Sequence, residues 1–251
     1  MFVTENQAAV SILASAVQLM VLSGYHDQTY QPARTSADKL HQHRLLWQAY
    51  VIQSDLSLRL CIPPLLSADI DLGLPEELPM DGSGIILFED GSILNFPREQ
   101  VMLARLQAAT YSRLYSPKSK DMSNHQLYEC IDELESDLQA WIGGIPELVR
   151  PPANIDDSHY TRLMSLTCLH YTYFQLTVAI HSVVFQKLAG NNTRGHETRI
   201  MSSVALCVGA ARATITLLDY HDNCHPYTMY VSNLYPLDTG ILFTKKFPDI
   251  S

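Results

Sequence analysis

The sequence is poor in the patterns that most enzymes and DNA-binding proteins carry. Its five cysteines are widely spaced and form no CxxC pair, a usage typical of free thiols in a reducing compartment. It contains no glycine-rich phosphate loop, dinucleotide fingerprint, nucleophile elbow or HExxH segment. Basic clusters are scarce too, because Lys245 and Lys246 are the only adjacent Lys or Arg residues. The chain therefore shows neither a catalytic signature nor a basic face for nucleic acid.

Charge is also scarce. Charged residues make up 17% of the 251 residues, and the formal net charge is −9. An acidic balance works against direct nucleic-acid binding, which relies on Lys and Arg. Hydrophobic residues make up 47%, enough to bury a sizeable core in a single domain over 1–251. So few charges indicate a surface that is less polar than usual or that a partner partly covers.

Two uncharged stretches have the length of membrane segments. Residues 6–25 are preceded by Glu5 and by no Lys or Arg, so they lack the positive start of a signal peptide. Residues 163–186 are long enough to span a bilayer, but they contain His170, His181 and several hydroxyl groups, which are costly in lipid. We predict no membrane association, a central bundle helix over 163–186, and an intracellular protein, nuclear or cytoplasmic.

The apolar spacing predicts an all-α fold, a multi-helix bundle with a small irregular insertion. The expected helices cover 5–23, 38–60, 97–115, 127–141, 158–189 and 196–220, and Gly143-Gly144 and Pro146 are expected to break the fourth. Residues 61–96 are rich in Pro, Gly and Asp. Within this insertion, Asp90-Gly91 favours a tight turn between strands over 85–88 and 93–96.

Four polar residues of the 158–189 helix are candidates for a ligand pocket: His170, Tyr171, Tyr173 and His181. Steps of three or four residues, through Thr177, allow His170, Tyr173 and His181 to share one face. They would then orient a small apolar molecule, or transfer protons if the protein is an enzyme. The alternative is a set of core polar residues with satisfied hydrogen bonds and no catalytic role.

One local cluster contains metal-ligand residue types. His221, Asp222, Cys224 and His225 lie within five residues. Zinc sites usually draw their ligands from two separated pairs, so that a tetrahedron can close. Because this spacing does not match, we predict no metal and no cofactor.

The segment from 37 to 77 carries four short patterns in a fixed order. They are His43-Arg44-Leu45-Leu46-Trp47, Asp55–Leu60 followed by Pro63-Pro64, Asp69-Ile70-Asp71, and Leu74–Glu77. They resemble the R-R-x-x-W, D-x-x-x-S-x-x-x-G-R-P-P, D-x-D and L-P-x-E elements of the fungal-specific transcription factor domain. This domain is the middle homology region of zinc-cluster transcription factors. With weaker similarity downstream, the resemblance covers most of residues 5–220.

The resemblance implies a motif that holds the bundle together and builds no active site. Its members are Arg44, Trp47, Asp55, Arg59, Pro63, Pro64, Asp69 and Asp71. Arg44 and Asp55 are three helical turns apart and can share a face, and Asp55 and Arg59 can pair at i,i+4. Two departures stand out. Cys61-Ile62 replaces the family's Gly-Arg, and the six-cysteine zinc cluster is absent.

These observations favour a regulatory module of fungal transcriptional control that senses an effector or binds a protein partner. Its partners would be proteins of transcriptional regulation or a small apolar molecule, without direct contact to DNA. The alternative is a stand-alone small-molecule-binding protein or enzyme of a fungal secondary metabolic pathway, built on the same fold. The chain ends soon after residue 240, where family members generally continue with more helices. We therefore expect either a truncated piece or a stand-alone protein.

Overall fold

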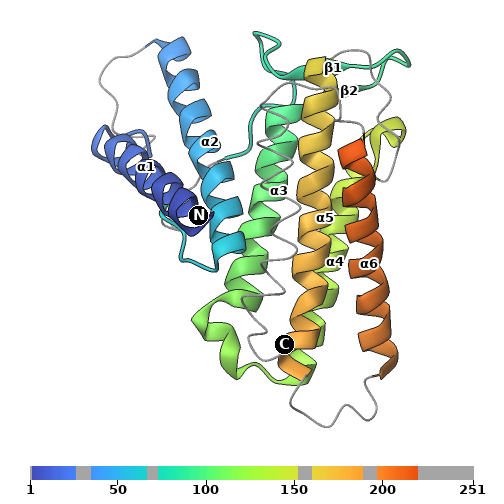
Figure 1. The fold of residues 1–251 in the computed structure, drawn as a ribbon. Helices are drawn as coiled ribbons and strands as arrows, with labels where there is room; N and C mark the ends of the chain where they lie inside the picture. Colours follow the sequence, from blue (N-terminus) through green and yellow to red (C-terminus); the bar gives the residue numbers. More distant parts are fainter. Residues whose placement is uncertain (1, 27–34, 67–72, 152–159, 189–196, 220–251) are drawn as a thin grey trace.

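The computed structural model describes residues 2–26, 35–66, 73–151, 160–188 and 197–219, and its fold is all-α as predicted (Figure 1). Its α-helices and strands are α1 (Phe2–Leu22), α2 (Ser36–Leu60), β1 (Ile85–Leu87), β2 (Ile93–Asn95), α3 (Phe96–Thr110), α4 (Asn124–Gly144), α5 (Tyr160–Leu188) and α6 (Glu197–Asp219). Three short turns, η1 (Tyr111–Tyr115), η2 (Pro117–Asp121) and η3 (Glu147–Val149), lie between them.

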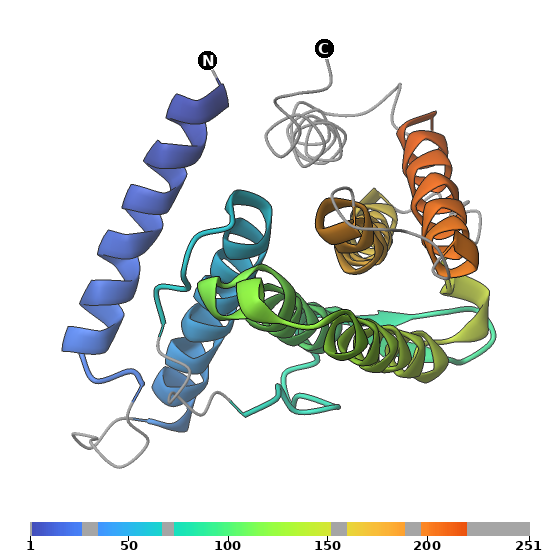
Figure 2. The same cartoon turned by 90° about the horizontal axis from the view of Figure 1, so that it is seen from below.

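Helices α3, α4, α5 and α6 form the main bundle, and consecutive helices run in opposite directions (Figures 1 and 2). In α4 the buried positions recur every three or four residues, at Leu127, Ile131, Leu134, Leu138 and Trp141. This spacing places them on one helix face, which packs on α3 and α5. The core thus lies where α3, α4 and α5 meet.

Helices α1 and α2 form a second, smaller layer beside α3 (Figure 2). A separate apolar cluster joins them, made of Leu13, Val17, Ala49, Leu56 and Leu66. Helix α2 packs on both α1 and α3. It therefore connects the small layer to the main bundle.

Local signals explain the helix starts. Thr35 and Asp38 form a reciprocal capping box at α2, and Ser123 and Gln126 form one at α4. The Asn95 side chain accepts from the Arg98 N–H at the start of α3. These bonds satisfy N–H groups that have no partner within the helix.

The predicted hairpin is present and leads directly into α3. Strands β1 and β2 pair antiparallel, with Ile85 opposite Asn95 and Leu87 opposite Ile93. Gly84, at φ +79°, precedes the hairpin, and a Cβ at this position would lie 2.5 Å from Pro97 Cγ. The close approach of the chain to the start of α3 therefore requires glycine here.

Two helix ends differ from expectation. Helix α4 includes Gly143 and Gly144 and has Ile145 as its C-cap, so it stops before the expected Pro146 and not at the glycines. Ile145 precedes Pro146 and is extended, because a residue before proline avoids the helical conformation. Helix α3 becomes the π-helical turn η1, in which the Ser116 N–H donates to the Tyr111 carbonyl at 2.9 Å.

Candidate functional site

Polar side chains gather where the C-terminal half of α2 packs on the main bundle. Asp55 Oδ2 lies 2.7 Å from Arg59 Nη2, one helical turn further along. The Arg59 side chain is 7% exposed and the Asp55 side chain 17%, so the pair is mostly removed from water. Loss of either partner from such a pair is costly. The i,i+4 pair expected from the sequence is present.

Two amides from neighbouring helices also contact the Asp55 carboxylate. Gln107 of α3 and Gln175 of α5 direct Nε2 at Asp55 Oδ1, at 3.4 and 3.2 Å. Gln107 Nε2 also lies 3.1 Å from Gln175 Oε1. Both glutamines are buried, where amides need such partners. One carboxylate therefore joins α2, α3 and α5.

Arg44 and Trp47 instead attach the irregular segment to α2. Arg44 Nη2 donates to Asp81 Oδ1 at 2.8 Å, and Trp47 Nε1 donates to the Gly73 carbonyl at 3.0 Å. Arg44 pairs with Asp81 rather than with Asp55, because eleven residues along a helix cover about 16 Å. Two side chains that far apart share a face without touching.

The end of α2 has an unusual backbone. Cys61 caps the helix at φ 53° and ψ 44°, a left-handed conformation that glycine adopts at lower cost. The family that this segment resembles usually has glycine here, so the turn is present although the residue differs. Pro63 and Pro64 follow and are exposed. Asp69 and Asp71 lie outside the described residues.

Three of the four pocket candidates of α5 are buried in the main bundle. His170 and Tyr171 are each 1% exposed and His181 is 4% exposed. Tyr173 is partly buried and stacks on Trp141 of α4, with 6.2 Å between ring centroids. All four are packed against side chains of the bundle. A ligand site at these residues stays a prediction.

The two histidines have different partners. His170 Nε2 donates to the Val149 carbonyl at 2.9 Å. His181 Nδ1 lies 3.4 Å from Ser203 Oγ, and its Nε2 lies 3.8 Å from a Glu135 carboxylate oxygen. Burial lowers the pKa of both histidines, opposed by the Val149 bond at His170 and chiefly by Glu135 at His181. Both rings are therefore neutral near pH 7.

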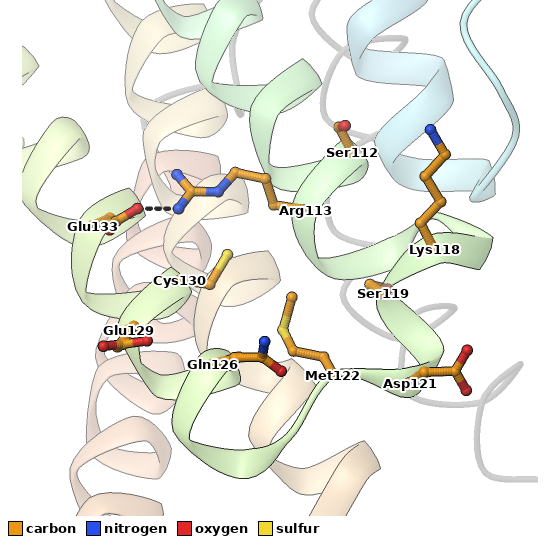
Figure 3. Close-up of a pocket in the computed structure, with 10 residues that line it drawn as sticks. All are labelled: Ser112, Arg113, Lys118, Ser119, Asp121, Met122, Gln126, Glu129, Cys130 and Glu133. Atoms are coloured by element: carbon orange, nitrogen blue, oxygen red, sulfur yellow. Dashed lines mark hydrogen bonds and ion pairs between the residues drawn. The ribbon is translucent and has the colours of Figure 1, made fainter.

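A cleft of about 500 Å³ opens between the end of α3 and the start of α4 (Figure 3). Its volume falls within the range of about 300–1,000 Å³ that small-molecule sites occupy. Its lining comes from η1, η2, the segment that follows η2, and α4. The lining residues are Ser112, Arg113, Lys118, Ser119, Asp121, Met122, Gln126, Glu129, Cys130 and Glu133.

The cleft combines charged groups with two sulfur atoms. Arg113 and Glu133 form an ion pair across one end. The side chains of Met122 and Cys130 point into the space between η1 and α4 (Figure 3), and Cys130 is buried. Polarizable sulfur side chains adapt to irregular apolar shapes. The arrangement thus suits a molecule with an apolar body and polar groups at its edge.

Sequence reasoning singled out none of the cleft residues as a site. The one sequence signal near the cleft is Pro117, which predicts the end of the helix indicated by the apolar spacing of residues 101–115. That break does not reveal that Arg113 lies against α4, because the contact is tertiary. The potential metal ligands His221, Asp222, Cys224 and His225 lie outside the described residues.

The chain is similar over most of its length to fungal transcription factors. It is 30% identical over 227 residues, 85% of this chain, to an ABC-transporter-regulating transcription factor of Aspergillus fumigatus. A protein of the same description from Aspergillus oryzae shows the same identity and coverage. The Fusaridione A cluster transcription factor of Fusarium heterosporum is 22% identical over 212 residues, 84% of this chain.

The shared region is a minor part of those relatives. The chain spans 25% of each Aspergillus protein and 40% of the Fusarium protein. No family model matches the chain, and no solved structure matches it. The predicted resemblance is confirmed at the level of homology to fungal transcription factors.

Proposed function

We propose that this chain is a regulatory module of fungal transcriptional control that senses a small molecule and does not contact DNA. The observation that carries the proposal is the similarity to three fungal transcription factors over about 85% of the chain. The net charge of −9 supports a role without direct DNA contact. A module of this kind would work in the nucleus, through protein partners.

The proposed effector site is the cleft between η1 and α4. Cys130 and Met122 offer adaptable contacts to an apolar body. Lys118 is exposed and lines the same cleft, and it would attract an anionic or hydrogen-bonding group at the rim. The effector class that fits is therefore a small amphiphilic molecule, apolar at one end and polar at the other.

The π-turn η1 offers a route from the cleft to the helix core. Ser112 and Arg113 line the cleft, while Tyr115, at the end of the same turn, donates its hydroxyl to the Ala179 carbonyl of α5. A π-turn holds more residues than an α-turn. A ligand that favours either the π-turn or an α-turn at η1 would move Tyr115 relative to α5. Such a ligand shifts the equilibrium between the two turn conformations only if its affinity for them differs.

A thermal-shift screen of the purified chain tests the site. Amphiphilic small molecules that bind should raise the melting temperature, and Arg113→Gln should abolish the rise. Arg199→Gln is the matched control, because Arg199 pairs with Asp132 on the same α4 helix but does not line the cleft. The control should keep the response of the wild type.

A second test measures regulation in cells. The chain is fused to an unrelated DNA-binding domain, and a reporter gene is measured with and without a molecule found in the screen. We expect a response that Arg113→Gln removes and Arg199→Gln retains. A response lost in His181→Phe but kept in Arg113→Gln would contradict the cleft as the effector site. It would favour a site at the polar residues of α5 instead.

A further inference from the structure

The outer face of α6 is apolar and exposed. The opposite face packs on α5 and contains Ser203, Cys207, Ala210 and Thr214, all buried. On the outer face, Met201 is 65% exposed, Val208 41% and Ile215 60%. The helix is long and apolar enough over Glu197–Leu217 to cross a membrane by length and composition, and only 28% of its most apolar stretch is buried. Contiguous apolar surface of this kind marks an interaction site.

Two charged residues flank the Met201–Val208 part of this apolar stripe, and Ile215 lies about one turn beyond the second of them. Glu197 lies one helical turn before Met201, and Arg212 lies one turn after Val208, on the same face. Both are exposed, and neither pairs with an opposite charge among the described residues. From Glu197 through Met201, Ala205 and Val208 to Arg212, the spacings are four, four, three and four residues. The series of spacings is nearly the same when it is read from Arg212 back to Glu197.

We infer that the α6 outer face binds a second copy of this chain, with the two α6 helices antiparallel. Around a two-fold axis near Ala205, Glu197 of one copy faces Arg212 of the other, and Met201 faces Val208. The small side chain of Ala205 allows the two helices to approach closely at the axis. A two-fold interface of this kind repeats every contact, so an ion pair forms at both ends.

Charge complementarity is the reason that a second copy fits better than a lipid bilayer. The hydrocarbon core of a bilayer offers no partner to Glu197 or Arg212, and charged groups inside lipid are costly. Arg199 also anchors α6 to α4, through its ion pair with Asp132 and its position 4.5 Å from the Tyr128 ring centroid. The helix therefore stays on the bundle, and only its outer face is offered to a partner.

The expected affinity is modest. One helix pair buries less than the roughly 1,200 Å² that is the lower limit of standard interfaces. The dimer should therefore form in the micromolar range and dissociate on dilution. This inference is independent of the effector cleft, which lies on η1, η2 and α4.

Sedimentation equilibrium of the 251-residue chain tests the inference. We expect a monomer–dimer equilibrium that Val208→Asp abolishes and Arg212→Glu weakens by at least tenfold. The double variant Glu197→Arg/Arg212→Glu should restore the wild-type dissociation constant, because the ion pairs re-form with their signs exchanged. Ile12→Asp is the matched control, since Ile12 of α1 is 70% exposed and lies on another helix. It should dimerise like the wild type.

Three results would overturn the inference. The first is a chain that stays monomeric at about a hundred micromolar. The second is a double variant that remains as weak as Arg212→Glu, which would exclude the antiparallel pairing. The third is flotation with anionic phospholipid vesicles that Val208→Asp abolishes, which would make the face a lipid-binding surface. Circular dichroism of each variant establishes that α6 is still folded.

Discussion

Replacing Asp55 with alanine removes the carboxylate that Arg59, Gln107 and Gln175 contact. Arg59, with a side chain 7% exposed, then loses its ion pair with Asp55 in a site that water hardly reaches. Breaking a buried pair typically costs about 3–5 kcal/mol. Because the Asp55 side chain is itself 17% exposed, we expect the low end, a loss of about 3 kcal/mol in the free energy of unfolding.

Thermal and urea unfolding measure this loss. For a chain of this length, about 3 kcal/mol corresponds to a fall in melting temperature of about 6–12 °C. Asp81→Ala is the matched control, because it breaks the Arg44 pair, whose side chains are 35% and 45% exposed. Exposed pairs contribute at most about 1 kcal/mol, so the control should melt close to the wild type.

A double variant separates the pair from the rest of the network. Arg59→Met removes the buried charge, so Asp55→Ala/Arg59→Met should be less destabilised than the sum of the two single changes. Two results would refute the reasoning. One is an Asp55→Ala protein that melts like Asp81→Ala. The other is a double variant whose loss is simply additive, which would mean that the two charges do not interact.

Further changes probe other features. Cys61→Gly should raise the free energy of unfolding by about 1 kcal/mol, because glycine relieves the left-handed cap; chemical denaturation measures the gain, and an unchanged midpoint contradicts it. Gly84→Ala should lower the melting temperature more than Gly91→Ala, since a Cβ has open space at Gly91 and meets Pro97 at Gly84. The wild type should lose stability as pH falls below the ordinary histidine value of about 6.5, because the lowered pKa of His170 leaves the unfolded chain binding more protons. Between pH 7.5 and 5 the melting temperature of His170→Phe should change less with pH than that of the wild type. An equal change in both proteins would exclude His170 as a source of the pH dependence. A mobility-shift assay should detect no sequence-selective binding to duplex DNA, and a salt-resistant selective shift would contradict that expectation.

Helix positions could be predicted from the sequence because they depend on local signals. The predicted helix over 38–60 and the observed Ser36–Leu60 differ by two residues at the start, where the Thr35–Asp38 capping box extends the helix. The predicted 196–220 and the observed Glu197–Asp219 differ by one at each end. The Asp55–Arg59 pair was equally accessible, since i,i+4 neighbours meet on any helix.

Contacts between distant segments escaped prediction. Gln107 and Gln175 lie 52 and 120 residues beyond Asp55, and no local pattern links three polar residues at such separations. The cleft depends in the same way on Arg113 reaching Glu133 of another helix. The outer face of α6 was missed for another reason. An apolar helix gives the same periodic signal whether its second face meets a partner or water.

The division of the apolar interior into two clusters sets an order for local opening. The smaller cluster, which includes Leu13, Val17 and Leu56, holds α1 to α2 and to the segment after α2. Helix α5 contributes instead to the larger cluster. Backbone amides of α1 should therefore exchange hydrogen for deuterium long before those of α5, through openings that leave the bundle intact. The carboxylate of Asp55, held by amides from α3 and α5, marks where such an opening should stop.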